Sequence, residues 1–108
     1  MLRMNSDEFE RLVSEALDSL PEQFATRLDN VVVMVEDEPS GEDLDDLEDV
    51  ELLGIFRVRP PLPDQIAIFR NPILRIARDR RSALRQIRDT VIHELGHYFG
   101  LGDDDMIY

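Results

Sequence analysis

Apolar residues near the start of the chain recur every three or four positions, which is the spacing of one face of an amphipathic helix. Asn5 precedes this stretch and Glu8 stands three residues later, the spacing of a capping box at a helix start. The pattern predicts a helix over residues 7–20 that ends at Pro21, followed by a shorter helix over 22–28. The residues expected to face the core from the first helix are Phe9, Leu12, Val13, Ala16, Leu17 and Leu20.

Three apolar stretches in the middle of the chain predict strands. Residues 31–35 are almost continuously β-branched, so we expect a strand that is buried on both faces. A second strand is predicted over 52–58, where Gly54 indicates a bulge or a close backbone approach. Alternating apolar residues predict a short third strand over 65–70, and Asn71-Pro72 then begins a helical stretch.

The longest helix is predicted over residues 81–100, and its two faces differ in character. At about 100° per residue, its apolar side chains fall in a stripe about 80° wide, whereas His93 and His97 lie on the opposite side, about 40° apart. Gln86 and Thr90 are their polar neighbours. A core histidine would lie in the stripe, so we expect both histidines to face a separate polar space. The stripe consists of Leu84, Ile87, Val91 and Leu95.

The histidines belong to the segment His93-Glu94-Leu95-Gly96-His97, which has the form HExxH. Histidines at positions i and i+4 rise from adjacent helical turns, so both imidazoles can bind one cation at about 2.0–2.1 Å. Glu94 projects beside the cation, where it can take a proton from a water activated by the metal. The spacing therefore indicates a metal centre with Glu94 as general base. A chance match on a metal-free helix is the alternative.

Residues after the motif can supply a third ligand. Gly100 stands where the chain must leave the helix, because glycine adopts the dihedral angles of a helix C-cap without strain. The turn can then bring Asp103 beneath the helix, with Asp104 and Asp105 as alternatives. Three protein ligands and an open fourth position are typical of catalytic zinc. Imidazole and carboxylate ligands favour Zn²⁺, although nickel, cobalt and iron accept them as well.

Composition and charge narrow the function classes. The chain has 108 residues, which fits one domain over 1–108, and no cysteine, which excludes disulfides, thiolate metal sites and cysteine nucleophiles. A net charge of −12 argues against binding nucleic acid. No apolar run is long enough to span a bilayer, and the first residues lack the apolar core of a signal peptide. We therefore expect a cytoplasmic protein with no membrane partner.

Acidic and basic residues are segregated along the chain. Residues 36–51 contain ten acids and no base, whereas residues 55–88 contain nine arginines and two acids. This distribution predicts a solvated acidic loop over about 37–49, paired in part with the arginine-rich stretch. We expect that loop to be mobile and to have no role in the metal site.

The stretch HELGHYFGLGD, residues 93–103, resembles the H-E-x-x-H-x-x-G-x-x-H/D signature of metzincin-like zinc metallopeptidases. The chain as a whole is similar to the small bacterial zincin-like metallopeptidases of about this length. That similarity extends to Leu20-Pro21, to residues 31–39, to Leu52-Leu53-Gly54 and to residues 88–103.

The resemblance implies that His93, His97 and Asp103 bind zinc and that Glu94 is the general base. With the residue patterns, it leads us to expect an α+β fold: a minimal zincin-like domain with a small three- to four-stranded mixed sheet, packed helices and the HExxH motif on the C-terminal helix. The expected function is zinc-dependent hydrolysis of peptide bonds in a peptide or protein substrate. The strand over 66–69 would lie at the sheet edge, where an extended peptide could pair with it.

Two other functions stay open. The chain could be a metal-binding or partner-binding module whose catalysis is weak or lost. The metalloendoribonucleases of bacterial ribosomal-RNA maturation are similar in carrying His-x3-His-x5-His. In this chain Asp103 takes the third place, Glu94 follows the first histidine and the net charge is strongly negative, all of which disfavour RNA. The sequence sets no oligomeric state.

Overall fold

The computed structural model describes residues 1–44 and 52–98 of the chain. Its elements are α1 (Ser6–Asp18), α2 (Glu22–Ala25), the 3-10 helix η1 (Thr26–Leu28), β1 (Val31–Glu36), α3 (Gly41–Leu44), β2 (Gly54–Arg57), β3 (Asp64–Phe69), α4 (Arg70–Ile76) and α5 (Arg80–Tyr98). The α+β class and a mixed sheet of three strands agree with the sequence prediction. Asn5 caps α1 as predicted, because its side chain accepts a hydrogen bond from the Glu8 N–H at 2.9 Å.

The strand order is β1-β3-β2, with β1 parallel and β2 antiparallel to β3. The prediction that residues 66–69 lie at the sheet edge is therefore wrong, because β3 is hydrogen-bonded on both sides. Four successive residues of β3, Ile66 to Phe69, are fully buried. A strand that is apolar on both faces is stable only in the middle of a covered sheet.

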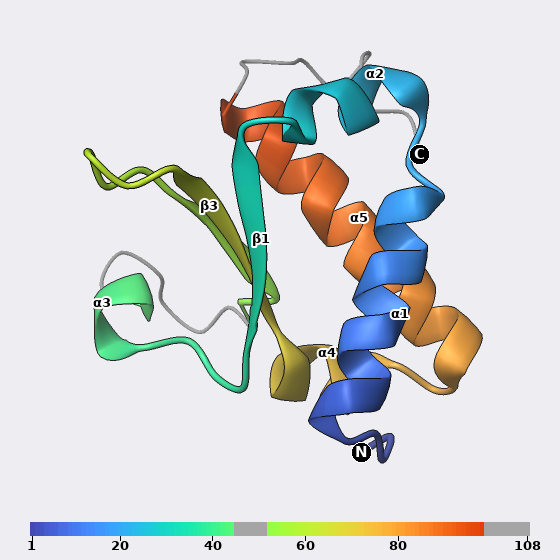
Figure 1. Ribbon diagram of the computed structural model, residues 1–108. Coiled ribbons are helices and arrows are strands. Elements are labelled where there is room, and N and C mark those ends of the chain that lie inside the picture. The colour runs from blue at the N-terminus through green and yellow to red at the C-terminus, as the bar shows by residue number, and fades with distance from the viewer. Residues whose placement is uncertain (45–51, 99–108) are drawn as a thin grey trace.

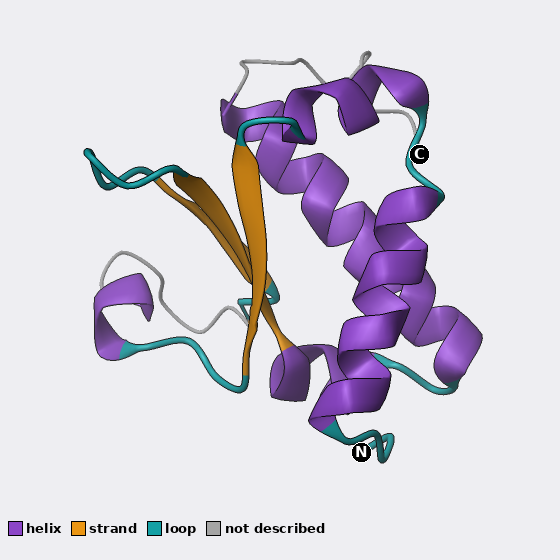
Figure 2. Ribbon diagram, viewed as in Figure 1, coloured by secondary structure: helices purple, strands orange, loops and turns teal. Residues whose placement is uncertain are grey.

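α1 and α5 lie on one face of the sheet, whereas the short helix α3 lies on the other side, so the structure has two main layers (Figures 1 and 2). α1 and α5 pack against each other and over this face, and their apolar stripes form the core with β3. The largest fully buried side chains include Phe9, Leu12, Phe24, Ile66, Ile68, Ile73, Ile87 and Leu95. Within residues 1–44 and 52–98, no helix is both long and apolar enough to cross a membrane.

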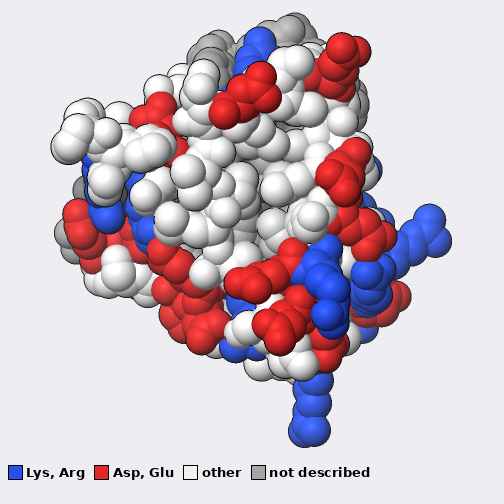
Figure 3. Space-filling model, viewed as in Figure 1, with Lys and Arg blue, Asp and Glu red and all other residues white. Residues whose placement is uncertain are grey.

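β1 is less buried than its sequence predicts. Val31, Val33 and Val35 pack against the core, but Val32 on the other face is 45% exposed. The expectation of a strand buried on both faces is wrong, because α1 and α5 cover only one face of the sheet. Figure 3 shows uncharged side chains over this part of the molecule.

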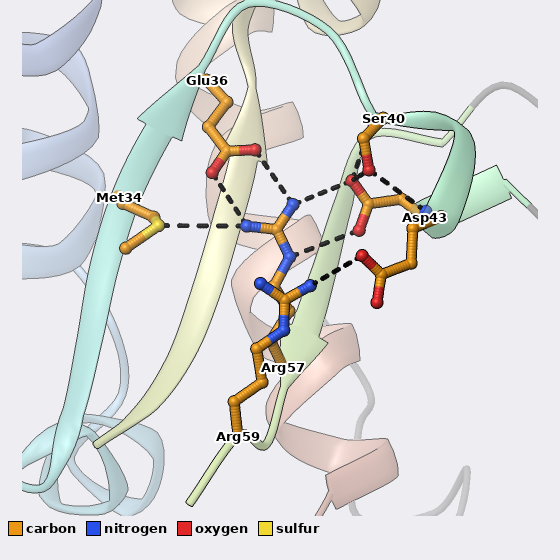
Figure 4. Close-up of polar contacts among 7 residues, drawn as sticks. Met34, Glu36, Ser40, Asp43, Arg57 and Arg59 are labelled. Atoms are coloured by element: carbon orange, nitrogen blue, oxygen red, sulfur yellow. Dashed lines mark hydrogen bonds and ion pairs between the residues drawn. The ribbon is translucent and has the colours of Figure 1, made fainter. Parts of the chain in front are cut away.

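Arg57 of β2 forms the main polar contact on the opposite face of the sheet (Figure 4). Its guanidinium donates to both Glu36 carboxylate oxygens at 2.8 and 2.9 Å and to Asp43 Oδ2 at 2.8 Å. Ser40 donates its N–H and hydroxyl to the same carboxylate of Asp43. The Arg57 and Asp43 side chains are only 9% and 3% exposed. One buried cation therefore joins β2, β1 and α3.

The acidic segment is paired with arginines as predicted, in the part that the structure describes. Arg59 lies 3.6 Å from Glu42, Arg70 binds Asp37 at 2.9 Å, and Arg75 binds Glu38. The loop predicted over 37–49 contains a helical turn in its described part, and its mobility stays a prediction. Residues Gly41–Leu44 form a helical turn, and Asp43 is buried because Arg57 neutralises it and Ser40 hydrogen-bonds it. Residues 45–49 lie outside the described residues.

We expect Arg57→Met to lower the free energy of unfolding by about 3–5 kcal/mol, because it leaves Asp43 buried without its cation. Arg59→Met is the matched control, because Arg59 stands two residues after Arg57 and its ion pair with Glu42 is exposed. We expect that ion pair to contribute about 1 kcal/mol or less to the free energy of unfolding. Urea denaturation measures both. Adding Asp43→Asn to Arg57→Met should recover part of the loss. Equal effects of Arg57→Met and Arg59→Met would contradict the assignment.

The same cluster predicts a pH dependence. Hydrogen bonds from Arg57 lower the pKa of Glu36. Burial alone would raise the pKa of Asp43, but hydrogen bonds from Arg57 and Ser40 outweigh it and the pKa is lowered. Both groups thus stabilise the fold fully above their unfolded pKa values, about 4, and lose this contribution as the pH falls through their lower folded values. The stability gap between parent and Arg57→Met should therefore narrow as the pH falls below about 4.

Candidate active site

α5 places its two histidines away from the core, as its sequence predicts. Ile87, Val91 and Leu95 are fully buried, whereas His93 and His97 are exposed. The four-residue spacing puts both imidazoles on the same side of the last two turns. The core therefore fixes the rotation of the helix, and that rotation directs the histidines outward.

The imidazoles are close enough to share one ion. Their Nε2 atoms are 2.9 Å apart, and the rings meet edge to face with centroids 4.4 Å apart. Two nitrogen ligands about 2.0–2.1 Å from a tetrahedral ion lie about 3.3 Å apart, a few tenths of an ångström more than this separation. The pair therefore fits two of the positions around a zinc ion.

The third ligand predicted from the sequence, Asp103, lies outside the described residues, as do Asp104 and Asp105. Among residues 1–44 and 52–98, no three His, Cys, Asp or Glu side chains form a group that could hold a metal ion. The described part of the site thus supplies a histidine pair, and Asp103 stays a prediction.

Glu94 is half-buried between α5 and β2, and the Phe56 N–H lies close enough to its carboxylate to lower the pKa. Phe69 donates its N–H to the Leu53 carbonyl at 2.9 Å. In an antiparallel pair every second residue hydrogen-bonds to the neighbouring strand through its backbone, so Leu53 and every second residue after it face β3 in this way. The N–H of Phe56 therefore points to the open edge, where Glu94 meets it. Burial raises the pKa of Glu94, although His97 and the Phe56 N–H act in the opposite direction.

Phe56 also holds the end of α5 through its ring. Tyr98, which follows His97, stacks on Phe56 with ring centroids 3.9 Å apart and an angle of 14° between the planes. The Tyr98 hydroxyl donates to Asp64 Oδ2 at 2.7 Å. Phe56, Tyr98 and Asp64 thus tie the histidine-bearing turn to β2 and β3. The sequence analysis did not identify these three residues, and an aromatic next to a motif residue was the only signal for them.

A cleft of about 360 Å³ runs along the histidine side of α5. Gln86 and Thr90 line it together with His93 and Glu94, which agrees with the polar face predicted for this helix. The opposite wall is the start of β2 and the two residues before it. The lining residues are Leu52, Leu53, Gly54, Gln86, Asp89, Thr90, His93 and Glu94.

Gly54 allows β2 to approach α5 closely, as the sequence indicates. A Cβ atom at this position would lie 2.6 Å from Thr90 Cγ2 and 2.9 Å from the Ala67 carbonyl oxygen. Both distances are shorter than real Cβ contacts. Only glycine therefore lets the backbone of β2 lie against Thr90 while Phe56, two residues later, reaches Glu94.

A family model described as zincin-like metallopeptidase matches residues 28–108, three quarters of the chain. The chain belongs to the zincin-like metallopeptidase family. This match covers every residue of the cleft and both histidines.

A solved structure supports the similarity at the level of the fold. It is described as a conserved hypothetical protein from Thermus thermophilus, and it is 26% identical to this zincin-like chain. The match covers 89% of this chain and 94% of that one, with a TM-score of 0.60. A search of curated proteins finds no significant match.

We expect Gly54→Ala to destabilise the zincin-like fold by about 1–3 kcal/mol, because β2 must move away from Thr90 and Ala67. Thr90→Ser should restore part of this loss in the double variant, since it removes Cγ2 while keeping a hydroxyl for the Gln86 carbonyl. Gly41→Ala is the control, because a Cβ atom there meets nothing within 4 Å. Thermal unfolding of the four proteins measures the effect. A Gly54→Ala protein as stable as the parent would show that β2 does not need this approach.

Proposed function

We propose that this chain is a zinc-dependent peptidase that hydrolyses peptide bonds in an extended peptide or protein segment. The observation that carries the proposal is the His93–His97 pair at 2.9 Å beside the half-buried carboxylate of Glu94, with His93 and Glu94 on the wall of one cleft. Membership of the zincin-like metallopeptidase family supports the same reaction class.

His93 and His97 would hold the ion through their Nε2 atoms, with Asp103 as the third ligand. When bound, zinc supplies a Lewis acid that polarises the substrate carbonyl and makes water more acidic. Among the metals that imidazole and carboxylate ligands accept, we propose zinc because three such ligands and an open position are its usual catalytic set.

Glu94 would be the general base. It takes a proton from the attacking water and passes it to the leaving nitrogen. Its raised pKa suits this role, because a carboxylate that is too weak a base would not accept the proton. The Phe56 N–H would help to orient the carboxylate from the β2 side.

The substrate would pair with β2, and not with β3 as the sequence led us to expect. β2 is an edge strand, and the backbone groups of Gly54 point away from β3 and lie in the cleft. An extended peptide can add to such an edge through backbone hydrogen bonds. It would then run beside α5, past Glu94 and His93.

A second candidate function is a metal-binding module without catalysis. Both functions require metal, and they differ in whether Glu94 affects turnover.

The first test concerns metal binding. His97→Ala removes one of the proposed ligands and should reduce the affinity for zinc by orders of magnitude, measured by competition with a chromogenic chelator. Gln86→Ala is the matched control, because it removes a polar side chain from the same cleft without removing a ligand. If the parent takes up no zinc with micromolar or better affinity, the metal site is wrong.

The second test separates ligand from base. Glu94→Gln keeps the size of the side chain but cannot accept a proton, so it should bind zinc about as well as the parent and lose chelator-sensitive hydrolysis of a peptide library. Hydrolysis at the parental rate would contradict the proposed mechanism. If the parent binds zinc but cleaves no peptide in the library, the metal-binding module becomes the better description.

A further inference from the structure

Arginines follow one face of the first half of α5. Arg81, Arg85 and Arg88 lie three or four residues apart on α5. Arg78 stands before the helix, three residues before Arg81. Residues with this spacing share a helix face. We call these four residues the arginine face. In Figure 3 basic side chains, with acidic ones among them, lie at the lower right, the end of the molecule where α5 begins in Figure 1.

Three of the four residues of the arginine face have no acidic partner among the described residues, unlike the arginines between residues 57 and 75 and Arg80. Arg57, Arg59, Arg70, Arg75 and Arg80 each form an ion pair. In contrast, Arg78, Arg81 and Arg85 form none with the described residues. Arg88 lies 3.9 Å from Asp89, and neither its Nε nor Asp89 Oδ1 has a hydrogen-bond partner in the described part of the chain.

The surface between these arginines is concave. One hollow of about 290 Å³ is lined by Arg78, Asp79, Arg81, Ser82 and Arg85, and another of about 210 Å³ by Arg81, Leu84, Arg85 and Arg88. Arg81 and Arg85 line both. Asp79 lines the first hollow as well, so three arginines face one acid there; its carboxylate accepts the Ser82 N–H at 2.8 Å and forms no ion pair with these arginines.

We propose that the arginine face binds an acidic segment of another polypeptide. Like charges three and four residues apart on a helix repel each other, so arginines that have no acidic partner among the described residues carry a cost that an acidic ligand removes. A guanidinium binds a carboxylate with two parallel hydrogen bonds, which suits glutamate and aspartate side chains on an extended segment. The two hollows that share Arg81 and Arg85 give such a segment a continuous track.

Two features favour a polypeptide over a nucleic acid as the ligand. No aromatic side chain lies between the four arginines, so the face offers no stacking platform for bases. The net charge of −12 repels a polyanion over the whole surface, whereas a short acidic segment needs only the local field of these arginines.

The experiment measures binding without added metal, so its result does not depend on the proposed peptidase activity. Two fluorescein-labelled twelve-residue peptides are compared by anisotropy: one alternates glutamate with serine, and the other has glutamine in place of glutamate. A twelve-nucleotide uridine RNA is the third ligand. We expect the parent to bind the glutamate peptide at least tenfold more tightly than the other two, and added salt to weaken this binding.

Arg81→Gln/Arg85→Gln should weaken binding of the glutamate peptide about tenfold, since two exposed charge pairs contribute about 1 kcal/mol or less each. The matched control is Arg3→Gln/Arg59→Gln, which changes the net charge equally at exposed positions elsewhere and should leave binding within about twofold. Circular dichroism checks that both variants fold. Equal losses in the two variants, equal binding of the glutamine peptide, or preference for the RNA would each overturn the proposal.

Discussion

The close approach of β2 to α5 is the contact on which the site depends. Gly54 makes it possible, because its missing Cβ leaves room for Thr90. Because β2 lies so close to α5, Phe56, two residues later, contacts the helix in two ways. Its N–H lies near the Glu94 carboxylate, and its ring stacks on Tyr98. The strand and the helix therefore fix each other: the strand orients the carboxylate, and the helix covers the core face of the strand.

β2 is held from its other face as well. Arg57 follows Phe56 and its side chain points to the opposite face of the sheet, where Glu36 and Asp43 bind it. Successive residues of a strand face opposite sides, so neighbouring side chains anchor β2 to two different layers. Four residues of an edge strand would be weakly placed by their backbone hydrogen bonds alone. The buried ion cluster thus contributes to the geometry of the cleft although it lies on the far side of the sheet.

The sequence predicted the parts of this molecule that follow from local periodicity. The cap at Asn5, the core stripes of α1 and α5 and the outward direction of His93 and His97 each depend on residues a few positions apart.

Strand order could not be predicted in this way, because it depends on contacts between segments about 30 residues apart, and β3 was misplaced at an edge. The burial of Asp43 could not be predicted either, because Asp43 is one of many acids in its segment. It differs from them by its contact with Arg57, which lies 14 residues later. Phe56 acts on Glu94 through its backbone N–H. Because almost every residue type has this group, the identity of residue 56 could not predict the contact. The place of Asp103 in the site is still a prediction.

The exposed side of β1 has a consequence for how this protein behaves in concentrated solution. β1 is an edge strand whose first five residues carry no charge, and Val32 is 45% exposed. Uncharged, unpaired edges act as templates on which further strands assemble, and proteins usually interrupt them with charged residues or proline. Here the protection comes from elsewhere, through the mutual repulsion of molecules that each carry a net charge of −12. That repulsion vanishes near the isoelectric point of about 4.4, so acidification removes the long-range barrier to edge-to-edge aggregation.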